Sequence, residues 1–163
     1  MKHIDLNIPQ GAIFSDDRKY RYLLWRIWNI YRPLRNLIGL NPSTANEFKN
    51  DPTITRDMVR ADRDGFGGIV RTNMYGYCSA DPDVLLGDGD FVGTENDDYI
   101  RYGISISEQT VCGWGSFPPA VKRAPEVLKM IPEPYCLGIN ADGQPKHPLY
   151  ISYKTQVVKY DPK

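Results

Sequence analysis

The chain has 163 residues, of which 41% are apolar and 25% are charged, a composition typical of one folded domain and not of a disordered segment. Its 20 Lys and Arg residues balance its 20 Asp and Glu residues, so the net charge gives no indication of a nucleic-acid partner. No apolar run approaches the ~20 residues of a membrane-spanning helix and no signal peptide opens the chain, so we expect a cytoplasmic protein with no membrane partner.

Charge is unevenly distributed along the chain. Residues 1–36 carry seven basic and three acidic side chains, and residues 118–163 carry seven and four. Residues 81–98 contain seven acidic side chains and no Lys or Arg. Basic ends around an acidic middle are compatible with a phosphate-facing surface, but ordinary solvated faces and loops are the commoner explanation.

No cofactor or metal site is expected. The three cysteines lie far apart and form no C-x-x-C pair, which excludes the common zinc and iron–sulfur patterns. No G-x-G-x-x-G, P-loop or G-x-S-x-G motif occurs, and the acidic segment 81–98 lacks the spacing of a calcium loop.

Residues 11–31 predict a β-hairpin. Ala12–Phe14 form a short strand, residues 15–17 a turn, and the aromatic-rich run 20–28 a second strand. A helix over residues 20–30 stays open, because the alternation breaks at two adjacent leucines. We therefore expect a single domain, 1–163, made of an N-terminal hairpin extension, 1–35, and a core, 36–163.

After the hairpin, strand-like and helix-like segments alternate. Asp51 is the predicted N-cap of the first helix, Pro52 is its first residue, and Gly65 and Gly67 end it. Pro125 is expected to interrupt or kink the last helix. The expected strands are 36–40, 68–77, 110–115 and 135–139, and the expected helices are 51–67, 95–107 and 118–131. This pattern predicts an α/β three-layer sandwich around a mainly parallel four-stranded sheet.

In open parallel sheets, ligands bind beyond the carboxyl ends of the strands. The residues that follow the predicted strands are therefore the candidates for a site. They are Asn41, Pro42, Ser43, Thr44, Asn73, Tyr75, Trp114 and His147.

Each candidate has a plain alternative role. Asn41 is either a turn residue that bonds its own backbone or part of a site with the hydroxyls of Ser43 and Thr44. Asn73 either satisfies loop backbone or pairs with the edge of a planar heterocycle. His147, between two prolines, is either a surface residue or a proton donor. Trp114 stacks on a base or packs on the sheet.

Several motifs together resemble a bacterial and phage family of unknown function, DUF1643. They are YRYLLWRIW, IGLNPSTAN, NDPTITR, TNMYGY, GTEND, GWG and YCLGINADGQPKHPLYIS, and they span nearly the whole chain. A more distant resemblance links the series G-x-N-P, strand-end Asn, W-G and H-P to the uracil-DNA glycosylase superfamily. That likeness implies a uracil-DNA-glycosylase-like fold.

The glycosylase resemblance also implies roles for three residues. Asn41 matches the residue that positions the attacking water, and Asn73 the residue that recognises the uracil edge. His147 matches the residue that hydrogen-bonds a uracil carbonyl as negative charge develops on the base. The chain departs from the superfamily in having Leu149 and Tyr150 in place of the Ser-centred insertion loop, and an Asn in place of the more basic Asp.

We therefore expect a protein that binds a nucleobase, a nucleotide or DNA and hydrolyses an N-glycosidic bond, with Asn41 and His147 as catalytic residues. One alternative is a non-catalytic module that recognises a nucleotide, a nucleic acid or a protein. Another is a nucleotide-processing enzyme that holds a metal ion with the acidic segment 81–98. The sequence gives no indication of the oligomeric state.

Overall fold

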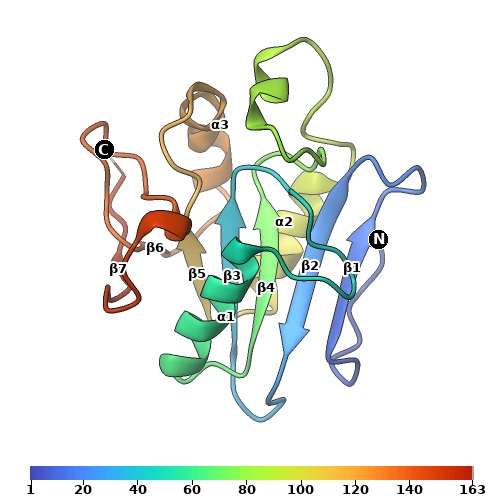
Figure 1. Cartoon of the computed structure of the whole chain (residues 1–163), viewed down its shortest axis with the longest axis vertical. Coiled ribbons are helices and arrows are strands. Elements are labelled where there is room, and N and C mark those ends of the chain that lie inside the picture. Colours follow the sequence, from blue (N-terminus) through green and yellow to red (C-terminus); the bar gives the residue numbers. More distant parts are fainter. Residues whose placement is uncertain (163) are drawn as a thin grey trace.

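Within residues 1–162, which the computed structural model describes, seven strands form one mixed sheet (Figure 1). Its strand order is β1-β2-β4-β3-β5-β6-β7. The strands are β1 Gln10–Phe14, β2 Arg21–Ile27, β3 Leu34–Gly39, β4 Gly68–Asn73, β5 Gln109–Cys112, β6 Pro134–Cys136 and β7 Val158–Lys159. The prediction of an α/β fold is confirmed.

The sheet is larger than the four strands expected from the sequence. Strands β4, β3, β5 and β6 run parallel to one another. The hairpin β1–β2 joins them, because β2 pairs antiparallel with β4. At the other edge, β7 pairs antiparallel with β6. The hairpin predicted as an extension is therefore continuous with the central sheet.

Residues 21–27 form a strand and not the alternative helix. Every residue of β2 is buried, since β2 lies between β1 and β4 and is covered on both faces. A strand that is buried on both faces has no polar side, which explains why the alternation breaks at Leu23 and Leu24.

Three helices cover the two faces of the sheet (Figure 1). They are α1 Pro52–Arg63, α2 Asn96–Ser105 and α3 Pro118–Leu128. Leu37 of β3 packs in a cluster with Ile54 of α1, whereas the next residue, Ile38, packs with Ile100 of α2 and Val127 of α3. Since neighbouring side chains of a strand point to opposite faces, α1 covers one face and α2 and α3 cover the other.

The first helix begins as the sequence predicts. The Asp51 carboxylate caps it by accepting a hydrogen bond from the Ile54 backbone N–H at 2.9 Å, and Pro52 is its first residue. The helix ends just before Gly65, whose φ of 89° is the left-handed conformation that glycine adopts without strain. By contrast, α3 is not interrupted, since it extends through Pro125 to Leu128. Over residues 1–162, every helix is too short or too polar to cross a bilayer.

Candidate functional site

A cleft of about 360 Å³ opens at the carboxyl ends of β3 and β4. It brings together four of the residues that the sequence places at strand ends, Asn41, Ser43, Asn73 and His147. The start of α1 also borders the cleft. Because β2 runs antiparallel to β4, the first residue of β2, Arg21, lies at the same edge of the sheet and lines the cleft too.

The strand ends are tied to each other by backbone hydrogen bonds. The register pairs Gly39 of β3 with Asn73 of β4. Beyond it, the N–H of Met74 donates to the Gly39 carbonyl at 2.8 Å, and the N–H of Tyr75 donates to the Leu40 carbonyl at 3.0 Å. These bonds continue the ladder past the strands and fix where Asn73 and the chain before Asn41 enter the cleft.

Asn41 lines the cleft and also hydrogen-bonds to the backbone of two loop residues. Its Nδ2 donates to the carbonyls of Pro42 at 3.1 Å and Ser79 at 3.0 Å. This is the turn-residue role that the sequence left open. Since both donor hydrogens are engaged, the orientation of the amide is fixed and its Oδ1 is the atom that remains for a ligand or a water molecule.

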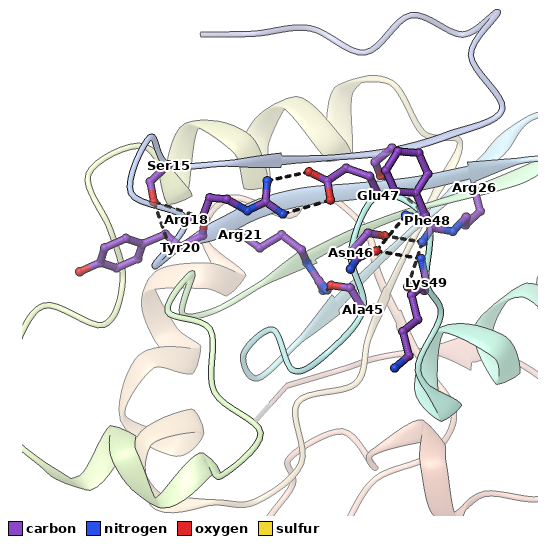
Figure 2. A network of polar contacts seen from close by, with 11 residues as sticks. Ser15, Arg18, Tyr20, Arg21, Arg26, Ala45, Asn46, Glu47, Phe48 and Lys49 are labelled. Carbon is purple, nitrogen blue, oxygen red and sulfur yellow. Dashed lines mark hydrogen bonds and ion pairs between the residues drawn. The ribbon is translucent and has the colours of Figure 1, made fainter.

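The loop over residues 41–50 is held by the N-terminal hairpin (Figure 2). Arg21 donates through Nη1 to the Ala45 carbonyl at 2.7 Å, and Arg26 donates through Nη2 to the Asn46 carbonyl at 2.6 Å. Outside them, Arg18 forms a bidentate pair with Glu47, with distances of 2.8 and 3.1 Å. The hairpin thereby positions one wall of the cleft.

Asn73 is the most unusual polar group in the cleft. The residue is 1% exposed, and neither its Nδ2 nor its Oδ1 has a hydrogen-bond partner within residues 1–162. Burial of an amide without partners costs roughly 1–3 kcal/mol. The structure therefore does not bear out the alternative that this side chain satisfies loop backbone.

His147 enters the cleft as a neutral donor. It precedes a short 3₁₀ turn, Pro148–Tyr150, and its Nδ1 accepts a hydrogen bond from the Leu149 N–H at 3.2 Å. With Nδ1 as acceptor, the neutral ring carries its proton on Nε2. Burial, and next the positive charge of Arg71, lower the pKa of His147 to about 4. The imidazole is thus uncharged at neutral pH.

The turn that carries His147 is fastened to α1. Arg60, which is 2% exposed, donates through Nη2 to the carbonyls of Pro148 at 3.1 Å and Ile151 at 2.6 Å. Arg56 donates to the same Ile151 carbonyl, and its guanidinium lies 4.1 Å above the Tyr153 ring. These arginines lie on the helix, so the sequence pattern alone gave no reason to connect them with a distant loop.

Two further arginines of the cleft were missed by the sequence analysis because each lies within an apolar strand. Arg71 donates through Nη1 to Asp57 at 2.7 Å, and both side chains are buried. Burial raises the pKa of Asp57 to about 6, against the opposing attraction of Arg71. Burial also lowers the pKa of Arg21 to about 10, with Arg71 as the next contributor. The available signal was a charged residue inside each buried strand.

The structure does not bring the remaining candidates into the cleft. Trp114 is 1% exposed, donates to Gln144 at 2.9 Å and packs edge-on against Tyr160, so packing is its observed role. Tyr75 donates to the Pro119 carbonyl at 2.8 Å and lines a separate cavity of about 590 Å³ beside the acidic loop. Pro42 is buried and Thr44 is exposed, and neither lines the cleft.

The acidic segment 81–98 was considered as a possible metal-binding segment. In the part of the chain that the structure describes, no three His, Cys, Asp or Glu side chains are grouped so that they could hold a metal ion. Asp97, at the end of this segment, instead pairs with Arg123 of α3.

Residues 21–149 match the family described as "Protein of unknown function (DUF1643)", and the chain belongs to this family. The match begins at the first residue of β2 and ends two residues after His147, so it includes every residue that lines the cleft except Tyr150. No match to the chain was found among the curated proteins or among the solved structures. The resemblance to uracil-DNA glycosylases therefore rests on the short motifs alone.

Proposed function

We propose that this DUF1643 protein binds a nucleobase-bearing ligand in the cleft at the ends of β3 and β4, in the manner of a uracil-DNA glycosylase. The observation that carries the proposal is the buried amide of Asn73, which has no hydrogen-bond partner among residues 1–162. A side-chain amide offers one acceptor beside two donor hydrogens. This pairs with the edge of a base that presents a ring N–H next to a carbonyl, and such pairing would remove the cost of burying the amide.

His147, which lines the same cleft, supports the same proposal. Its Nε2–H is the donor left to the cleft, and its low pKa keeps the ring neutral. A preorganised neutral donor stabilises negative charge that develops on a base carbonyl, which is the charge that forms when a base leaves a sugar.

Hydrolysis of an N-glycosidic bond further requires a positioned water molecule and an acceptor for its proton. The fixed Oδ1 of Asn41 is suited to hold the water. Asp51, whose Oδ1 caps α1, adds a carboxylate to the same cleft and is a better proton acceptor than an amide. In this reaction the water oxygen bonds to the anomeric carbon, its proton passes to Asp51, and the base leaves with the electrons of the broken bond.

A non-catalytic module that recognises a nucleotide, a nucleic acid or a protein is the second candidate. Two observations favour it. The donor hydrogens of Asn41 are already engaged with the loop backbone. In addition, the residues after His147 form a short turn that Arg60 fixes to α1, in place of an insertion loop.

One assay separates the two candidates. Uracil-containing single- and double-stranded oligonucleotides are incubated with the wild type and with His147→Ala, and release of free base is measured alongside binding. Release by the wild type and its loss in His147→Ala support hydrolysis. Binding without release of free base, equal for the wild type and His147→Ala, supports the module. Absence of both binding and release for oligonucleotides, nucleosides and nucleotides contradicts the proposed function.

A further inference from the structure

Most of the buried charged side chains of this protein are positive, although the formal net charge of the whole chain is zero. Within residues 1–162, six arginines are buried but only one acidic residue, Asp57, is. The buried arginines are Arg21, Arg26, Arg35, Arg60, Arg71 and Arg123. Because an unpaired charge is costly to bury, each of these guanidiniums needs a partner.

Most of the six have partners that account for their burial. Arg35 pairs with Asp64 at 2.9 Å, and Arg123 pairs with Asp97 and Glu126. Arg26 and Arg60 each donate to two or more oxygen atoms of loops, although Nε and Nη1 of Arg60 have no partner in the described part of the chain. These four guanidiniums hold the structure together and lie outside the lining of the cleft.

Arg21 differs from these four in that it lines the cleft. It is 2% exposed, its guanidinium donates to the neutral Ala45 carbonyl, and its Nε has no partner in the described part of the chain. The nearby Arg71 lines the same cleft and is paired with Asp57 through Nη1. Its Nη2 and the Oδ1 of Asn73 both lie close to Gly39, since a Cβ atom built on Gly39 would meet both atoms.

The start of α1 completes this wall of the cleft. Thr53 and Ile54, in the first turn of the helix, border the cleft, and the positive end of the helix dipole lies there. Two carboxylates lie nearby: Asp51 caps the helix through Oδ1, and Asp57 pairs with Arg71. Two guanidiniums, a helix N-terminus and a buried amide therefore face one cavity.

We propose that the ligand of this cleft is an anionic nucleotide, whose phosphate binds between Arg21 and Arg71 at the start of α1 while its base faces Asn73. The base-binding part of this proposal rests on the proposed function, whereas the phosphate-binding part rests on the two guanidiniums and the start of α1. A planar guanidinium binds two phosphate oxygens at once, which makes arginine the preferred residue for this ligand.

Calorimetric titrations with three kinds of probe test the two halves separately. The probes are inorganic phosphate, the common nucleosides and their 5′-monophosphates. We expect a monophosphate to bind roughly 10- to 100-fold more tightly than its nucleoside, and less tightly as salt is added. Equal affinity of nucleoside and monophosphate overturns the phosphate site but leaves base binding intact. Binding of phosphate with no contribution from any base supports the phosphate site and contradicts the proposed function. Absence of all binding overturns both.

Two variants, both checked for a native fold, test the role of Arg71 in phosphate binding. Asp57→Asn removes the internal counter-charge of Arg71 but keeps both guanidiniums, so the monophosphate should bind as tightly as to the wild type or more tightly. Arg71→Gln combined with Asp57→Asn replaces the ion pair by two neutral amides and should lose roughly tenfold or more of the affinity. Circular dichroism and thermal unfolding establish that both variants are folded. Equal affinity in the two folded variants overturns the assignment of Arg71.

Discussion

Gly39 lies directly beneath the guanidinium of Arg71, so that a Cβ atom built on Gly39 would stand 2.0 Å from Nη2. The same Cβ would stand 2.9 Å from Oδ1 of Asn73. Glycine at the end of β3 thus makes room for the two side chains that β4 sends into the cleft.

Replacement of Gly39 by alanine should therefore displace both side chains. We expect Gly39→Ala to lower the free energy of unfolding by about 1–3 kcal/mol, as overpacking of a buried site does, and to weaken nucleotide binding. Urea denaturation and calorimetry measure the two effects. Gly87→Ala is the control, because its nearest neighbour would be the Val84 carbonyl at an ordinary 3.4 Å. A Gly39→Ala variant as stable and as active in binding as Gly87→Ala contradicts the tight fit.

Asn73 and Asn96 are both buried asparagines, yet their replacement should affect the free energy of unfolding to different extents. Asn73→Ala breaks no side-chain hydrogen bond within the described residues, so its unfolding free energy should stay within about 1 kcal/mol of the wild type while ligand affinity falls. Asn96 donates to the Asn73 carbonyl at 2.9 Å and to the Met74 carbonyl at 3.2 Å. Asn96→Ala should therefore cost roughly 1–3 kcal/mol. If Asn73→Ala proves the more destabilising of the two, its side chain has an internal structural role that the proposal denies.

The protonation of His147 should make the stability depend on pH in a defined window. The pKa of this residue is about 4 in the folded state, below its ordinary value of 6.5, because burial and Arg71 disfavour the charged ring. The unfolded chain then binds more protons, so stability is complete above pH 6.5 and is lost progressively as the pH falls from 6.5 to 4.

This dependence can be measured directly. The imidazole resonances of His147, followed by NMR, should titrate near pH 4, and His147→Asn should lose less stability than the wild type between pH 6.5 and 4. Asparagine is a suitable replacement because it can also cap the 3₁₀ turn. A midpoint near 6.5 for His147 would show that the ring is charged more easily than its surroundings imply.

The hairpin contacts with the loop 41–50 should differ greatly in strength. Arg26 is buried and donates to Asn50 Oδ1 at 2.8 Å and to the Asn46 carbonyl at 2.6 Å, so Arg26→Ala should cost about 2–4 kcal/mol. The Arg18–Glu47 pair lies at the surface, and Glu47→Ala should cost no more than about 1 kcal/mol. Urea denaturation of both variants tests this ranking, and an equal or reversed order would show that the loop is not held by β2.

The sequence predicted the elements that form this cleft because each has a strong local signal. Asp51 and Pro52 mark the start of α1, and the polar residues Asn41 and Asn73 stand out where apolar strands end. Parallel strands bring their carboxyl ends to one edge, so the meeting of these two amides followed from the topology.

Other features depend on contacts between distant residues, and the sequence pattern does not contain them. The sequence analysis did not select Arg21 and Arg71, because arginine is mostly exposed and the partners of a buried arginine are not visible in the sequence. Trp114 follows a strand as the site residues do, but Tyr160, far along the chain, covers it. The two-residue strand β7 is too short for any alternation to show.

The central claim is that Asn73 and His147 face a base in the cleft at the strand ends. Titration of isotopically labelled protein with nucleosides and their 5′-monophosphates, followed by NMR, tests it most directly. The account predicts that the side-chain amide of Asn73, the ring of His147 and the backbone around Asn41 shift together. Shifts confined to the cavity beside Tyr75, or no shifts with any of these probes, would contradict it.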